Sequence, residues 1–244
     1  MTTRHSQRLY MPMPLYSGAI IAPSDSQSHY LISVLRLKDG ADIRLFNEND
    51  GEFLAKIAML SRKKIELHCT DQISPPQAEP DLTLVFAPIR RQRMETMIEK
   101  ATELGVTRCA PVLTDYAQTP QVNLPRLNSI ATEAAEQSGR LSIPDFDEPK
   151  RLQAFCQGLD GEAMIFCDEA LAGDKAAHML AFLELRASQR PSHILIGPEG
   201  GFSDQEKRFL LDQPNIHGVS LGARILRSDT ASILALGLWQ ASLN

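Results

Sequence analysis

Residues 82 to 244 alternate between short apolar runs and amphipathic segments, and this alternation constrains the fold more than any other feature. The apolar runs are LTLVFAPI, RCAPVLT, AMIFCDE, HILIG and HGVSLG. Between them lie segments with helical periodicity, namely RMETMIEKATELGV, residues near 124–139 and 174–187, and the stretches that begin at Ser203 and Ser228. Strands that alternate with helices predict an α/β domain with a mainly parallel sheet and helices on both faces.

The stretch ILIGPEGGFSDQE, residues 194–206, holds the most informative junction in this pattern. A β-branched run stops at Gly197 and Pro198, and Ser203 with Glu206 matches the capping box that begins a helix. In open α/β sheets, ligands bind at the carboxyl ends of strands, and glycines let a ligand approach the backbone amides. A tight turn without a ligand is the alternative. The loop lacks G-x-G-x-x-G and the Lys-Ser/Thr of a Walker A motif, which disfavours nicotinamide and nucleoside triphosphates.

Three of the predicted strands are each followed by a short segment that ends the apolar run, at residues 167–169, 197–201 and 221–227. We expect them to line one pocket. A pocket built from backbone amides and apolar side chains, with little positive charge beyond the arginines, suits an adenosine-like ligand better than a polyphosphate.

Residues 1–73 show a different pattern. The β-like runs GAIIA, ADIRLFN, EFLAKIAML and KIELHCT predict a small β-barrel or sandwich. The piece HYLISVLRLKDG predicts one helix, with Leu31, Val34 and Leu35 on one face and Gly40 at its end. Residues 74–81 contain three prolines and predict a linker, so the second domain is expected at 82–244.

The net charge of −5 is distributed unevenly, since residues 1 to 70 hold nine Lys/Arg and seven Asp/Glu. Arg4, Arg8, Arg36 and Lys38 in this mildly basic part are therefore candidate phosphate contacts for RNA. Solvated surface charge is the alternative for clusters this small.

Several compositional features exclude other classes of protein. The four cysteines, Cys69, Cys109, Cys156 and Cys167, show no C-x-x-C spacing and no nearby histidine pairs, so we expect free buried thiols and no metal. The amino terminus has no apolar signal region, and no run of about 18 apolar residues occurs. A cytoplasmic protein without membrane insertion is expected.

Several segments, in the same order along the chain, resemble signatures of the RsmE family of bacterial methyltransferases, which modify N3 of a uridine in 16S ribosomal RNA. They are HYLISVLRLKDG, EKATELGV, EAAEQSGR, IGPEGGFSDQE and SLGARILRSDTA. Two positions depart from the family pattern: Ala223 stands where proline is usual, and Asp229 where glutamate is usual. The shorter carboxylate leaves open whether Asp229 has the side-chain role of that glutamate.

The resemblance implies a PUA-like RNA-binding β-barrel at 1–73 and a SPOUT domain at 82–244 with a trefoil knot at about 193–244. It implies S-adenosylmethionine as cofactor, 16S rRNA of the small ribosomal subunit as partner, and a homodimer. The apolar final helix, TASILALGLWQASL, points to the same homodimer because it needs cover on two sides. Carried onto this sequence, the cofactor contacts are Ile196, Gly197, Pro198, Glu199, Gly200, Gly201, Leu221, Gly222, Ile225 and Leu226.

Methylation at N3 requires loss of a weakly acidic proton, and a cation would stabilise the resulting anion. Arg227 is the first candidate for that catalytic cation and Arg224 the second; a surface or phosphate contact is the alternative for both. Glu199 could accept the proton, balance the sulfonium charge or cap the helix at Ser203. The last two roles are favoured, because a carboxylate of ordinary pKa is a poor base for so weak an acid. The proton acceptor is left unassigned.

Two other functions remain open at this point. A knotted methyltransferase that acts on a ribose 2'-hydroxyl would share the cofactor loops. A non-catalytic rRNA-binding assembly factor could keep the fold, although the intact GPEGG and RILR segments favour an enzyme. The target nucleotide, and whether naked rRNA or an assembled subunit is the substrate, do not follow from the sequence.

Overall fold

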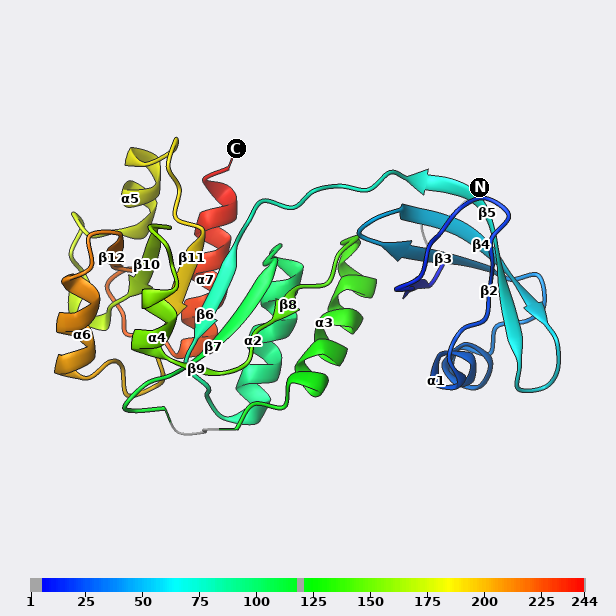
Figure 1. The fold of residues 1–244 in the computed structure, drawn as a ribbon, viewed down its shortest axis with the longest axis horizontal. Coiled ribbons are helices and arrows are strands. Elements are labelled where there is room, and N and C mark those ends of the chain that lie inside the picture. The colour runs from blue at the N-terminus through cyan, green and yellow to red at the C-terminus, as the bar shows by residue number, and fades with distance from the viewer. Residues whose placement is uncertain (1–5, 118–120, 244) are drawn as a thin grey trace. The chain divides into compact units, whose positions relative to one another are not determined.

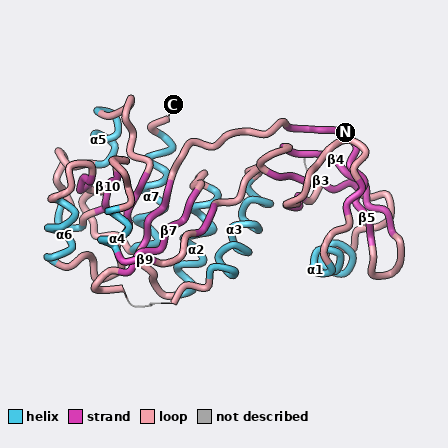
Figure 2. Tube along the Cα trace, in the orientation of Figure 1, coloured by secondary structure: helices cyan, strands magenta, loops and turns pink. Residues whose placement is uncertain are grey.

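The structure, a computed structural model, describes residues 6–117 and 121–243 (Figure 1). The chain divides into two compact units, which are described separately. The first comprises Met1–Ala78 with Ala135–Ser142, and the second comprises Glu79–Ala134 with Ile143–Asn244. Strands dominate the first unit, whereas helices and strands alternate in the second (Figure 2).

The first unit is built on a five-stranded sheet of order β1-β3-β4-β5-β2. Its strands are β1 (Arg8–Tyr10), β2 (Ile20–Ile21), β3 (Asp42–Asn47), β4 (Gly51–Met59) and β5 (Ile65–Ser74). The pairs β3–β4, β4–β5 and β2–β5 are antiparallel, and β1–β3 is parallel. The four predicted β runs are therefore confirmed. The short strand β1 was not predicted, because three residues are too few to show an alternating pattern.

The helical segment of the first unit begins at Asp25, four residues before the predicted piece, and ends early. α1 (Asp25–His29) is followed by a π-helical turn, Tyr30–Val34. Leu31 is fully buried, but Val34 is 59% exposed, and Arg36 has already left the helix with φ of +55°. The prediction of a single helix that buries both Leu31 and Val34 is therefore wrong. A π-turn closes i→i+5 hydrogen bonds, so it rotates later side chains away from the face that a 3.6-residue period assigns to them.

The second unit contains a seven-stranded sheet of order β12-β10-β11-β6-β7-β8, with β9 paired to β7. Its strands are β6 (Thr83–Phe86), β7 (Arg108–Leu113), β8 (Asp145–Phe146), β9 (Lys150–Arg151), β10 (Met164–Cys167), β11 (His193–Ile196) and β12 (Ile216–Val219). Every strand pair in it is parallel. The five strands expected from the apolar runs are confirmed, and the two-residue strands β8 and β9 were not predicted.

Helices cover both faces of this sheet, as the alternation predicts. They are α2 (Arg91–Glu103), α3 (Leu124–Ser138), α4 (Leu152–Gln157), α5 (Met179–Leu185), α6 (Asp204–Leu211) and α7 (Ser228–Ala241). Along β11, Ile194 and Ile196 join a core cluster with residues of α2, α3, α5 and α7. Leu195 points to the opposite face and joins residues of α4 and α6. Successive side chains of one strand thus feed two cores.

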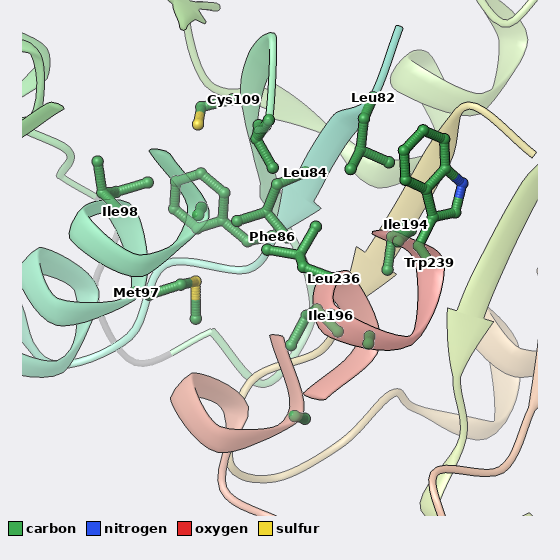
Figure 3. Close-up of a cluster of buried hydrophobic side chains, with 14 of the residues drawn as sticks. Leu82, Leu84, Phe86, Met97, Ile98, Cys109, Ile194, Ile196, Leu236 and Trp239 are labelled. Carbon is green, nitrogen blue, oxygen red and sulfur yellow. The ribbon is translucent and has the colours of Figure 1, made fainter. Parts of the chain in front are cut away.

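The carboxy-terminal helix α7 packs into the first of these cores (Figure 3). Leu236 is fully buried, and Trp239, 3% exposed, donates its indole N–H to the carbonyl of Pro191 at 2.8 Å. Two other apolar residues of α7, Ile233 and Leu234, are each 37% exposed. Helix α7 is therefore anchored along one side and partly open along another.

Candidate functional site

A cavity lies at the carboxyl ends of β10, β11 and β12. These three strands are neighbours in the sheet, so the segments that follow them meet at one edge. All three predicted strand-end segments contribute to the cavity wall, which confirms that they share one pocket. Seven of the ten residues predicted to contact a cofactor line it: Ile196, Gly197, Pro198, Leu221, Gly222, Ile225 and Leu226.

The other three predicted contacts, Glu199, Gly200 and Gly201, lie in the loop after β11 but not on the cavity wall. Gly201 adopts φ of +69°, and a side chain there would collide with the carboxylate of Glu169. The loop therefore favours glycine at this position for its left-handed conformation.

Ser228, the first residue of α7, joins the two main loops of the cavity. Its hydroxyl donates to the carbonyl of Gly197 at 2.7 Å, and the residue is 5% exposed. The start of α7, directly after loop 221–227, is thus tied to the loop after β11. The sequence marked Ser228 only as a helix start, because nothing local signals a partner 31 positions earlier.

An ion-pair cluster that the sequence analysis missed forms one side of the cavity. Asp168 and Glu169 line the wall, and Lys207 of α6 contacts their carboxylates at 2.9 and 3.1 Å. Although burial alone lowers the pKa of Lys207, its hydrogen bonds to Asp168 and Glu169 raise that pKa above the ordinary value. Lys207 therefore stays charged and partly neutralises the two acids.

Cys167 begins the same segment and also lines the cavity. Burial raises the pKa of its thiol to about 12, so the group is protonated at neutral pH and is a poor nucleophile. Cys69, Cys109 and Cys156 are not disulfide-bonded and are buried, as predicted, whereas Cys167 is half-buried.

Glu199 contacts Arg93 of α2, with 3.6 Å between the carboxylate and the guanidinium. The predicted capping role for Glu199 is wrong. Helix α6 begins with a reciprocal capping box in which Ser203 Oγ accepts from the Glu206 amide and the Glu206 carboxylate accepts from the Ser203 amide. Among residues 6–117 and 121–243, no backbone amide of α6 donates a hydrogen bond to Glu199.

The two candidate catalytic arginines occupy different places. Arg224 lines the cavity, whereas Arg227 lies outside it as the N-cap residue of α7 and accepts from the Ala231 amide through its carbonyl. Both are exposed. Within residues 6–117 and 121–243, neither guanidinium forms an ion pair.

Arg8, predicted as an RNA contact, is instead a structural residue of the first unit. It is 4% exposed, its Nε lies 2.5 Å from the Glu52 carboxylate, and it donates to the carbonyls of Ala135 and Arg140 at 2.6 and 2.8 Å. The guanidinium also lies 4.0 Å from the centre of the Phe46 ring. The assignment of Arg8 to phosphate binding is therefore wrong, because its donors are used inside the protein.

Of the remaining predicted RNA contacts, Arg36 and Lys38 are exposed, and Arg4 lies outside the described residues. No group of three or more His, Cys, Asp or Glu side chains within the described part of the chain could hold a metal ion. None of the helices described is long and apolar enough to span a membrane.

Comparison with models of protein families and with related proteins shows to which family this chain belongs. A model of the RNA methyltransferase domain matches residues 76–240, and a model of the RNA methyltransferase PUA domain matches residues 23–68. A Rickettsia conorii protein called ribosomal RNA small subunit methyltransferase E is 34% identical over 94% of this chain and 93% of its own length. This chain belongs to the ribosomal RNA small subunit methyltransferase E family. A Synechocystis member of the family is 31% identical over 92% of this chain and 74% of its own.

Solved structures agree with this family assignment. A putative methyltransferase of Legionella pneumophila, solved with SAM bound, superposes with a TM-score of 0.84 at 28% identity and covers 98% of both chains. A Neisseria gonorrhoeae family member bound to S-adenosyl methionine also has a TM-score of 0.84, over 97% of this chain and 98% of its own, and its 24% identity indicates a shared fold. The RsmE resemblance and the α/β fold with an amino-terminal PUA domain are confirmed. The trefoil knot at about 193–244, and the boundaries 1–73, 74–81 and 82–244, stay predictions.

Proposed function

We propose that this protein transfers a methyl group from S-adenosylmethionine to N3 of a uridine in 16S rRNA of the small ribosomal subunit. The observation that carries the proposal is the cavity at the carboxyl ends of β10, β11 and β12. It is lined by the two loops, 196–201 and 221–227, whose sequences resemble the signatures of the family to which the chain belongs.

The cavity residues fit such a cofactor. Ile196, Leu221, Ile225 and Leu226 provide an apolar wall, and the intervening backbone offers hydrogen-bonding groups. The adenine ring and the aliphatic carbons of S-adenosylmethionine suit this mixture, since such sites are mostly apolar with a few placed polar groups. When bound, the cofactor supplies an electrophilic methyl group. The hydrogen bond from Ser228 to Gly197 holds the start of α7 and the loop after β11 together around it.

The acidic side of the cavity suits a cationic ligand. The carboxylates of Asp168 and Glu169 outnumber the single ammonium of Lys207, so one negative charge remains uncompensated within this cluster. S-adenosylmethionine carries a sulfonium and an ammonium against one carboxylate, and therefore has a net positive charge. Opposite charges at short range in a partly buried site favour its binding.

We assign different roles to the two candidate arginines, Arg224 and Arg227. Arg224, on the cavity wall, is placed to contact the cofactor. Arg227 is exposed just outside the cavity without an ion-pair partner among the described residues, so its charge is available for the anion that develops on the uracil ring. Glu199, beside Arg93, is more suited to charge balance than to proton acceptance, because its carboxylate is already paired with a guanidinium.

We also propose a homodimer and a cytoplasmic location. Ile233 and Leu234 on α7 and Ile225, 78% exposed in the loop before it, present apolar surface beside the cavity loops. A symmetric partner is the commonest cover for such a surface. Light scattering at micromolar concentration would give twice the monomer mass, and a fully active monomer would overturn the dimer.

Mass spectrometry of nucleosides tests the proposed reaction. Small-subunit rRNA from cells that lack this chain should lose 3-methyluridine at one position, and re-expression should restore it. Loss of a 2'-O-methylated nucleoside instead would identify a ribose methyltransferase. Unchanged rRNA together with no calorimetric binding of S-adenosylmethionine would indicate a non-catalytic assembly factor.

A further inference from the structure

Tyr116 is an exposed aromatic residue that lies against the loop after β11. It follows β7 and is 52% exposed. A Cβ placed on Gly200 would lie 3.2 Å from the Cβ of Tyr116 and 3.6 Å from two atoms of its ring. Gly200 does not adopt a left-handed φ, so its conformation alone does not require glycine. The close approach of Tyr116 leaves little room for a Cβ at this position.

The turn that carries Tyr116 is held by a buried carboxylate. Glu206, 1% exposed, accepts from the amide of Asp115 at 2.9 Å while its other oxygen accepts from the Ser203 amide at 2.9 Å. The hydroxyl of Ser203 donates to the Asp115 carboxylate at 2.5 Å. One network therefore fixes both the start of α6 and the turn before Tyr116. The aromatic ring is exposed, but the backbone beneath it is preorganised.

The sheet topology places this ring beside the cavity and not inside it. β7 pairs with β6, and β6 pairs with β11, so the segments after β7 and β11 emerge at the same edge. Gly197 and Pro198 line the cavity, and two residues later Gly200 meets Tyr116. One loop thus separates the cavity from the exposed ring. Arg93 contacts Glu199 of the same loop and adds a cation next to it.

The chemistry of the proposed reaction requires a surface of this kind. N3 of uracil is engaged in base pairing within a helix, so an acceptor uridine must be unpaired or flipped out of its stack. A base removed from its stack loses the contacts of both its faces. Proteins replace those contacts by stacking the base on an exposed aromatic side chain.

We propose that Tyr116 is the platform on which the acceptor uracil stacks, next to the cofactor loop. The inference rests on the proposed function, since it takes an RNA uridine as the acceptor. Tyr116 then acts by positioning the base through its ring face, while its hydroxyl has no required part. The substitution series must therefore separate the ring from the hydroxyl and from simple apolar cover of Gly200.

Steady-state methylation of small-subunit rRNA by the full-length protein provides the first test. Tyr116→Ala should lower kcat/KM for RNA by about 5- to 150-fold, the range for loss of one base-stacking contact. Tyr116→Phe should retain wild-type activity, and Tyr116→Leu should resemble Tyr116→Ala because it covers Gly200 without an aromatic face. S-adenosylmethionine affinity and Tm should stay unchanged. Leu211→Ala, which trims another exposed apolar side chain of the second unit, is the matched control and should have no effect.

Photocrosslinking provides a second test that does not depend on turnover. Once the methylated position is mapped, an RNA with 5-iodouridine at that position is irradiated with the protein, and the crosslinked peptide is identified by mass spectrometry. A crosslink at Tyr116 supports the inference. Full activity of Tyr116→Ala, or rescue by Tyr116→Leu, would overturn it while leaving the reaction intact. Failure of the wild-type protein to methylate any uridine would instead overturn the proposed function.

Discussion

Replacing Ser228 with alanine removes a side-chain hydrogen bond that ties the start of α7 to the loop after β11. The hydroxyl donates to the Gly197 carbonyl at 2.7 Å, and the serine is 5% exposed. Loss of a neutral hydrogen bond of this kind costs about 0.5 to 1.5 kcal/mol. For a chain of this size, each kcal/mol shifts Tm by roughly 2 to 4 °C.

The same substitution should weaken cofactor binding, because Gly197 and Ser228 both line the cavity. If about 1.4 kcal/mol of the loss must be restored when the loops close on S-adenosylmethionine, the Kd rises about tenfold. Isothermal titration calorimetry measures the Kd, and denaturant unfolding with and without cofactor measures the change in stability.

Ser232→Ala is the matched control for Ser228→Ala. Ser232 lies on the same helix, is fully buried, and donates to the Asp229 carbonyl at 2.8 Å, inside α7 itself. Its loss should leave cofactor affinity unchanged, and alanine offsets part of the stability cost because it is the best helix former. Equal cofactor affinities for the two variants would refute the view that Ser228 couples the loops.

Three further predictions concern other parts of the molecule. Arg8→Ala should destabilise the first unit by about 3 to 5 kcal/mol in denaturant unfolding, because it leaves the carboxylate of Glu52 buried without its closest cation. The double variant Arg8→Ala with Glu52→Gln should recover part of that loss. An unchanged unfolding midpoint for Arg8→Ala would contradict the structural role of Arg8. Arg227→Ala should lower the single-turnover methylation rate by roughly 10²- to 10³-fold and leave the affinity for S-adenosylmethionine unchanged. Arg224→Ala should instead weaken cofactor binding. If Arg227→Ala lost methylation rate and cofactor affinity in parallel, the anion-stabilising role would be excluded. Burial lowers the pKa of His193 below its ordinary value of 6.5, so the unfolded chain binds the proton more readily than the folded chain. The free energy of unfolding should therefore fall as the pH drops through about 6.5. His193→Gln should flatten that part of the pH–stability curve, and an unaltered curve would count against this role of His193.

Most strands and helices of the second unit are encoded locally, and the sequence alone was enough to predict its five longer strands and the helices between them. The alternation along β11 puts Ile194 and Ile196 on one face and Leu195 on the other, and each packs into its own core. The capping box of Ser203 and Glu206 is complete within four residues and is present as predicted. Such features depend on neighbours a few positions apart, so periodicity and caps report them directly.

Local patterns failed where a side chain's environment is set by distant segments. Arg8 belongs to a basic cluster in the sequence, but residues 44 and 132 positions away surround it and use its donors. Val34 keeps the helical spacing that predicts burial, yet a π-turn exposes it. A charged residue or an apolar periodicity indicates whether a side chain tends to be exposed or buried. Tertiary packing decides whether the side chain follows that tendency.

The candidate site shows the same division between features that local sequence predicts and contacts that tertiary packing sets. The glycine-rich loops and the meeting of three strand ends follow from sequence pattern, because adjacent parallel strands end at one edge of the sheet. The partners of those loops do not. Lys207 reaches Asp168 from 39 positions away, Asp115 reaches Glu206 across 91, and Arg93 meets Glu199 only because β6 lies beside β11. The sequence by itself determined which backbone could hold a ligand. Only the tertiary structure decided which side chains surround it, since contacts between segments depend on the order of strands in the sheet and not on their order in the chain.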